Sequence, residues 1–242
     1  MREIFTIAWN TGKGILKMKV VYFLVICVWI LVGSMYRYDV ISLERHRELM
    51  LDMSLLLNQI AAILSVLSLT FDIPRELREG IAAAFLTKAL GRTKYIVGKA
   101  VGVCFVSVIV CTLVSIGSYG IYANCFPEPI LLIYCKIQLL ILLSAIPMSA
   151  LCTFCAVTLP EMAAPFISLL LIWFLALTRK IAIPVVNGGL LPDLDLFNLK
   201  EHVIYQVMIP WTYIGGVFVY GLCVAVFFLM LSGIILQMRD IK

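Results

Sequence analysis

The sequence predicts an all-α integral membrane protein, built as a single domain with six transmembrane helices. Hydrophobic residues make up 63% of the 242 residues and charged residues only 14%, whereas roughly 25% of the residues of a soluble domain are charged. The apolar residues gather in runs long enough for a helix to cross the hydrocarbon core, about 20 residues each. The net charge of +5 comes from cations near the ends of these runs. It is therefore no indication of nucleic-acid binding.

The segment 1–19 is expected to lie along the inner membrane surface as an amphipathic helix. Its apolar residues recur at helical spacing and include Trp9, which suits the headgroup region, and lysines follow toward the first span. A plain cytoplasmic extension of that span fits the same residues equally well. No small-residue cleavage site follows the first apolar run, so we expect this run to be retained as a span.

The six predicted spans alternate across the bilayer, with both chain termini in the cytoplasm. They cover residues 20–36, 51–70, 95–119, 130–157, 163–177 and 214–237. In this orientation twelve of the 19 lysines and arginines lie on the cytoplasmic side, in agreement with the positive-inside rule. The fourth span contains Pro147, so a kink or a tilt is expected there.

The outer segment 181–210 precedes the last span and is too polar to be a clean span itself. Prolines and the sequence Asn187-Gly188-Gly189 interrupt it, yet it holds several leucines and Phe197. We interpret it as a re-entrant or surface-lying element. Irregular backbone at membrane depth has to be shielded by protein or water.

The eight cysteines do not form a disulfide framework. Most fall inside predicted spans, where a thiol is a small apolar packing group. Cys125 and Cys135 flank an outer loop, and a disulfide between them remains an alternative to two free thiols. Cys152-x-x-Cys155 lies in the fourth span; packing explains this spacing more simply than a path for a soft metal ion.

A charged amphipathic segment, residues 73–91, lies between the second and third spans. Asp72 and Pro74 predict the start of a new helix there, because aspartate caps helices and proline is tolerated in a first turn. Apolar residues follow at i, i+4, i+7 and i+8, which defines one face: Leu77, Ile81, Ala84 and Phe85. Gly91 is expected to end this helix, because glycine commonly follows the last helical residue. A surface anchor without a partner and a docking element for a soluble protein both fit this pattern.

The segment resembles the first cytoplasmic loop of bacterial ABC-2 type transporter permeases. That loop carries a glutamate, a glycine four residues later, an apolar helix, a Lys-Pro-like pair, an arginine and a Gly-Lys dipeptide. The corresponding residues are Glu76, Gly80, Lys88-Ala89, Arg92 and Gly98-Lys99. Two positions depart from the family pattern: Ile81 replaces a threonine and Ala89 replaces a proline.

A second stretch strengthens the resemblance. Residues 191–200 are similar to the Pro-x-x-x-x-Phe-x-Leu segment that precedes the last span of these permeases, with Pro192, Phe197 and Leu199 at the matching positions. Together with the six-span layout, the resemblance covers nearly the whole chain. The broad group includes maturation permeases for multicopper enzymes, and no residue singles out that subgroup.

The resemblance implies the membrane subunit of an ABC exporter in the cell inner membrane. Its partners would be a separate ABC ATPase subunit, which binds ATP and Mg²⁺, a second permease subunit, most simply another copy of this chain, and the lipid bilayer. Segment 73–91 would then be the coupling helix that docks on the ATPase. The residues expected to act in coupling are Glu76, Leu77, Glu79, Gly80, Ile81, Phe85, Lys88 and Arg92.

The chain itself is not expected to be an enzyme. Gly12-Lys13-Gly14 is far from a Walker A pattern, and no catalytic constellation, metal site or cofactor site is visible. Asn58 and Gln59 lie in the middle of the second span, where hydrogen bonds between helices are favoured over contacts to substrate. Glu161, in the turn between spans four and five, is expected to meet the ATPase or segment 73–91, or to cap the fifth helix.

Two other functional classes stay open. A transporter or channel without an ATPase is one, although the lack of charged residues near the centre of any span counts against ion-coupled transport. A membrane scaffold that recruits a different soluble protein is the other. The sequence does not define the substrate; a hydrophobic or amphipathic one suits the apolar lining.

Overall fold

The computed structural model describes residues 2–17, 19–35, 46–79, 91–126, 130–181, 192–199, 202 and 207–238. Within these ranges every regular element is a helix, as predicted, and no strand occurs. The elements are α1 (Arg2–Leu16), α2 (Lys19–Met35), α4 (His46–Arg78), α6 (Arg92–Cys125), α7 (Leu131–Thr158), α8 (Ala163–Ile181), η1 (Asp195–Phe197) and α11 (Trp211–Met238).

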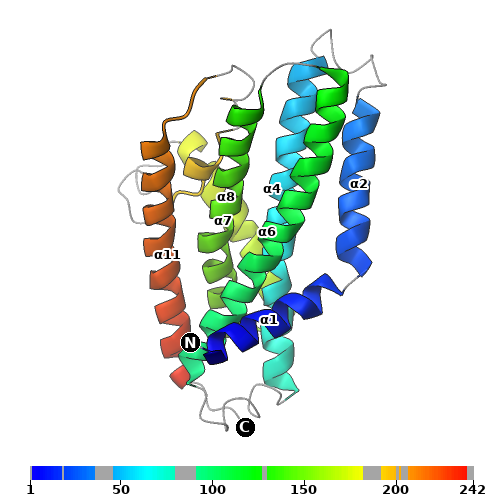
Figure 1. Ribbon diagram of the computed structural model, residues 1–242. Coiled ribbons are helices and arrows are strands. Elements are labelled where there is room, and N and C mark those ends of the chain that lie inside the picture. Colours follow the sequence, from blue (N-terminus) through cyan, green and yellow to red (C-terminus); the bar gives the residue numbers. More distant parts are fainter. Residues whose placement is uncertain are drawn as a thin grey trace.

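The six long helices, α2 to α11, run up and down alternately, and α1 lies across one end of the bundle (Figure 1). We call this the α1 end. α11 also finishes there, at Met238. Each of the six predicted spans overlaps one of these helices, although α4 extends beyond the predicted span 51–70 at both ends.

Helix length and composition alone support four membrane spans: α4, α6, α7 and α11. The pair α1 and α2, bent by 58°, would add a fifth if it were one span. The described apolar part of α8, Ala163–Ala176, is shorter. The helices of the described residues thus support a membrane protein with several candidate spans, whereas the count of six stays a prediction.

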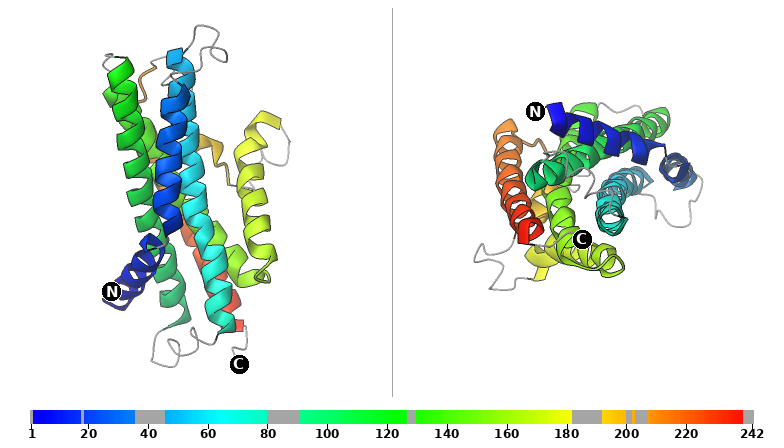
Figure 2. Two further views of the ribbon diagram at one scale, coloured as in Figure 1. Left: turned by 90° about the vertical axis from the view of Figure 1, so that its right-hand side faces the viewer. Right: turned by 90° about the horizontal axis from the view of Figure 1, so that it is seen from below.

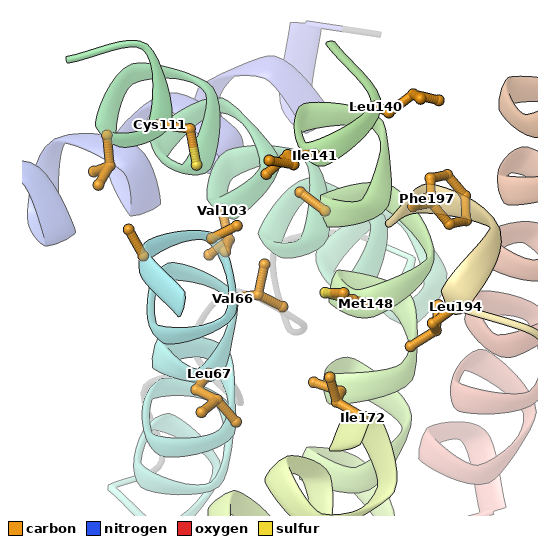
Figure 3. Close-up of a cluster of buried hydrophobic side chains, with 14 of the residues drawn as sticks. Val66, Leu67, Val103, Cys111, Leu140, Ile141, Met148, Ile172, Leu194 and Phe197 are labelled. Carbon is orange, nitrogen blue, oxygen red and sulfur yellow. The ribbon is translucent and has the colours of Figure 1, made fainter. Parts of the chain in front are cut away.

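α7 is the most buried of the four long apolar helices and packs against α4, α6, α8 and α11. Figure 3 shows the surrounding core, in which Val66 of α4, Val103 of α6 and Met148 of α7 converge. Pro147 lies inside α7, which continues to Thr158. The apolar contacts of a helix surrounded on nearly all sides compensate for the hydrogen bond that proline removes.

α1 and α6 cross closely because two glycines on α6 leave room for the backbone of α1. A Cβ atom on Gly98 would lie 2.9 Å from the Cβ of Ile7, and one on Gly102 would lie 2.6 Å from the carbonyl oxygen of Ala8. Gly98 and Gly102 form a Gly-x-x-x-Gly pair, the spacing that permits close helix contact in membranes. This crossing fixes α1 at the end of the bundle.

The predicted helix start at Asp72 and Pro74 is wrong. α4 runs without a break from His46 to Arg78, and Pro74 lies inside it. Ile73 and Pro74 are buried, so packing holds the chain in the helix although local signals favour a break. The part of the predicted coupling helix at 80–90 lies outside the described residues. Gly91 precedes α6 with a φ of −59°, so it lacks the left-handed conformation typical of a helix stop.

The segment 192–199 packs against α7, α8 and α11 rather than projecting away from them. Leu194 and Phe197 are buried. The Asp193 backbone N–H donates to the Tyr220 hydroxyl at 2.7 Å, and the Tyr213 hydroxyl donates to the Leu196 carbonyl at 2.8 Å. Protein groups thus satisfy part of its irregular backbone. Its depth in the membrane stays a prediction, and residues 182–191 lie outside the described part.

Three side chains lie near the opposite end of the bundle: Cys125, Cys135 and Lys136. Cys125 and Cys135 are free thiols, so the disulfide alternative does not occur. Lys136, near the start of α7, is only 7% exposed. Its Nζ donates to the Ile209 carbonyl at 2.7 Å and lies 5.0 Å from the centre of the Trp211 ring, because the non-helical segment before α11 offers an acceptor inside the protein.

Replacing Gly102 with leucine should destabilise the protein by about 2 kcal/mol, since the new side chain would force α1 and α6 apart. Thermal unfolding of the purified protein in detergent measures the effect. Gly120 of the same helix has open space where a Cβ would be, so Gly120→Leu is the matched control and should leave the midpoint nearly unchanged. Equal midpoints for both variants would contradict the close crossing.

Candidate functional site

Three helix ends meet at the α1 end of the bundle: α1, the last turns of α4 and the first turns of α6. α1 lies against α6 where the Gly98–Gly102 pair permits it, and Figure 2 shows α1 crossing the lower parts of the upright helices. α4 ends and α6 begins on either side of residues 80–90. Glu76, near the end of α4, is therefore placed beside charged residues of α6.

Glu76 of α4 is joined to α6 by two hydrogen bonds. Lys99 Nζ donates to Oε1 of Glu76 in a salt bridge, and the Tyr95 hydroxyl donates to Oε2 at 2.5 Å. Tyr95 and Lys99 are one helical turn apart on α6, so both point toward the same carboxylate. Glu76 and Lys99 both belong to the family-like pattern, and the structure brings them into contact.

The Glu76–Lys99 pair lies largely out of solvent. The side chain of Lys99 is 7% exposed and that of Glu76 24%. Removing two charges from water costs several kcal/mol per ion, and only good geometry with additional hydrogen bonds offsets this cost. The Tyr95 hydroxyl supplies such a bond. Loss of one partner would leave the other charge buried without compensation.

More exposed ion pairs surround this buried pair. Lys94 of α6 binds Glu3 of α1 at 3.0 Å. Arg78 of α4 binds Glu161, in the turn between α7 and α8, at 2.7 Å. Glu161 therefore does meet segment 73–91, one of the outcomes expected from the sequence. Each exposed pair contributes little stability by itself, but together they link α1, α4, α6 and the α7–α8 turn.

A cavity of about 460 Å³ opens between the same three helices. Glu76, Tyr95 and Lys99 form part of its lining, together with Asp72 of α4. The face of α1 toward the cavity supplies the rest: Glu3, Thr6, Ile7, Asn10, Thr11, Gly14 and Ile15. The site thus combines three carboxylates, one ammonium group, several uncharged polar side chains and two isoleucines.

The remaining coupling residues differ in what the structure shows. Leu77 is partly buried against the core, and Glu79 accepts a hydrogen bond from Arg75 one turn earlier on α4 at 2.9 Å. Arg92 is the first residue of α6, but its side chain is not described. Gly80, Ile81, Phe85 and Lys88 lie outside the described residues.

A second polar group lies inside the bundle around Asn58, which is fully buried. Its side-chain amide donates to Gln138 of α7 and, at 3.2 Å, to Ser115 of α6. These are hydrogen bonds between helices, as predicted for Asn58. Gln59, the next residue in the sequence, is half-buried. Gln138 escaped the sequence prediction, although an amide within a predicted span is itself a signal.

The sulfur atoms show no metal-binding arrangement in the described part of the chain. Cys152 and Cys155 are buried, and no three histidine, cysteine, aspartate or glutamate side chains among the described residues gather as ligands would. The sequence prediction also missed Tyr95 and the contact between Glu76 and Lys99. The contact joins two helices on opposite sides of a loop, which spacing along one helix does not reveal.

Glu76→Gln alone should destabilise the protein by about 3 kcal/mol, the lower end of the cost of breaking a buried ion pair, because Glu76 keeps some exposure. Lys99→Met alone should have a similar effect. The double variant should lose clearly less than the sum of the two, since it leaves no unpaired charge. Thermal unfolding of the wild type, the two single variants and the double variant in detergent gives the four values of this double-mutant cycle.

The exposed pair Arg75–Glu79 serves as the matched control for this cycle. Its double variant, Arg75→Gln with Glu79→Gln, should unfold at nearly the wild-type temperature. Strictly additive effects of Glu76→Gln and Lys99→Met would show that the two side chains do not interact.

No protein-family model matches this chain, and a search of curated proteins finds no significant match either.

Proposed function

We propose that this chain is the permease subunit of an ABC exporter in the cell inner membrane, coupled to a separate ATPase subunit. The observation that supports the proposal most directly is the link between Glu76 of α4 and the Tyr95–Lys99 turn of α6. The link joins the two helices that enter and leave residues 80–90. Those residues belong to the segment whose sequence resembles the coupling loop of ABC-2 type permeases.

A coupling element has to transmit displacement into the membrane helices. Residues 80–90 connect α4 to α6, and Glu76, Tyr95 and Lys99 join the two helices close to this connection in the sequence. A force on residues 80–90 should therefore move both helices together. The Arg78–Glu161 pair extends the connection to the turn between α7 and α8, and the Lys94–Glu3 pair extends it to α1. Most of the helix ends on this side are thereby connected to one docking segment.

The proposed mechanism needs no catalysis by this chain. The partner ATPase binds ATP and Mg²⁺, and its closure displaces residues 80–90 of two permease subunits. A ligand shifts such an equilibrium only by its different affinity for the two states. Here the ATPase dimer is the ligand, and the response is shear or rocking of packed helices. A second copy of this chain completes the pathway.

The proposal includes a topology with six spans and both termini in the cytoplasm. The alternating directions of α2, α4, α6, α7, α8 and α11 (Figure 1) are compatible with it. The α1 end then faces the cytoplasm, with Arg78 in the last turn of α4 and Lys94 in the first turn of α6, as the positive-inside rule favours. The segment 192–199 then belongs to the outer half of the protein.

The proposal predicts that an ATPase co-purifies with the tagged protein from its native membrane. Ile81→Asp and Phe85→Asp should reduce the recovered ATPase about tenfold or more, as expected for the loss of an apolar anchor at an interface. Leu77 is not a suitable position, because its side chain also packs against the core. Ile81→Val and Phe85→Leu keep the apolar character and serve as matched controls. Failure of the wild-type protein to retain any ATPase would favour a transporter, channel or scaffold of another kind.

Labelling of single cysteines in intact cells tests the topology separately. In a variant without native cysteines, Phe85→Cys should react with a membrane-impermeant maleimide only after the cells are opened. A cysteine at Asn124, an exposed residue at the far end of α6, should react in intact cells. The reverse pattern would place the α1 end outside and would make an ATPase partner there impossible.

A further inference from the structure

We propose that the cavity between α1, α4 and α6 binds the primary ammonium group of an amphipathic molecule, with Asp72 as its counter-ion and with Ile7 and Ile15 of α1 beside its hydrocarbon chain. This site is separate from the proposed docking segment at residues 80–90. It does not require an ATPase. Its volume of about 460 Å³ falls in the roughly 300–1,000 Å³ range of small-molecule sites.

The charges of the site favour a cation. Glu76 pairs with Lys99, and Glu3 pairs with Lys94, so these four groups cancel. Asp72 also lines the cavity but makes no hydrogen bond or ion pair within the described ranges, although it lies in the field of Lys99. One negative charge is therefore left over, and a single ammonium group neutralises it.

A second, independent feature points into the same cavity. Thr11 of α1 lines it, is only 7% exposed, and its hydroxyl has no hydrogen-bond partner among the residues that the structure describes. Because Thr11 lines the cavity, its hydroxyl can accept a hydrogen bond from a ligand that carries N–H groups. A primary ammonium group carries three such donors, enough for Asp72 and Thr11 together, whereas a quaternary one carries none.

Two residues of the lining suit a hydrocarbon chain, and they alternate along α1 with the polar residues Thr6 and Asn10. Ile7 and Ile15 are buried residues of α1 that face the cavity. The opposite face of α1 exposes Phe5 and Trp9, which is typical of a helix at the membrane interface. An amphipathic amine could thus keep its charge beside Asp72 and its chain along α1. The ethanolamine headgroup of a phospholipid and a free long-chain amine share this chemistry.

Photolabelling of the purified protein in lipid nanodiscs tests the site. The probe is hexadecylamine with a diazirine in its chain, and the comparison probe has a sulfate in place of the amine. The amine should label peptides of α1 and of the first turns of α6, and the sulfate should label them about tenfold less, the usual scale for loss of a charged hydrogen bond. Equal labelling by both probes would overturn the proposal.

Two variants address the residues. Asp72→Asn should reduce labelling by the amine about tenfold. Gly14→Leu should also reduce it, because Gly14 lines the cavity and a Cβ there meets nothing within 4 Å, so leucine fills the space without a clash. Glu161→Gln removes a carboxylate at the same end but outside the cavity and should label like the wild type. If Asp72→Asn fails to fold, Gly14→Leu decides; wild-type labelling of a folded Gly14→Leu protein would refute the site.

The lipid composition of the nanodiscs separates the two sources of the amine. If phosphatidylethanolamine occupies the site, it should suppress labelling relative to phosphatidylglycerol. If the ligand is a free amine, labelling should be the same in both lipids. Because these measurements use this chain alone, their outcome is independent of whether an ATPase partner exists.

Discussion

The contact on which the α1 end depends is the largely buried pair between Glu76 and Lys99. Two charges removed from water are held only where their geometry and surroundings compensate for lost hydration. Here the Tyr95 hydroxyl adds a hydrogen bond, and α1 covers the neighbouring part of α6 because Gly98 and Gly102 admit its backbone. We therefore infer that the pair fixes the relative positions of α4 and α6 more than it adds net stability.

The helices themselves could be predicted almost entirely from the sequence. A run of about 20 apolar residues has few alternatives to a helix in a membrane, and α7 and α11 follow their apolar runs closely. The end of α4 could not be predicted in this way. Asp72 and Pro74 are local signals for a new helix, but burial of Ile73 and Pro74 in the tertiary core overrides them. Lys136 shows the same limit, since its acceptor belongs to residues far along the chain.

Some members of the candidate site could be predicted, but Tyr95 and the contacts between members could not. Glu76 and Lys99 both stood out in the family-like pattern, and Asn58 stood out as an amide in a span. Their partners lie on other helices, and the sequence pattern of one helix predicts only which of its own residues share a face. The cavity depends on α1 lying across α4 and α6, which follows from a Gly-x-x-x-Gly pair that the sequence contains but whose partner helix it does not specify.

Two groups of polar side chains join different sets of helices in the bundle. The Glu76–Lys99 pair ties α4 to α6 at the α1 end, and the Asn58–Gln138–Ser115 group ties both to α7 deeper in the bundle. α8 contacts α4, α7 and η1, yet its far part diverges from the other helices (Figure 2). Polar contacts inside a membrane protein have discrete geometries, so helices joined by them move together. We therefore expect α4, α6 and α7 to act as one body, and relative motion to occur at α8.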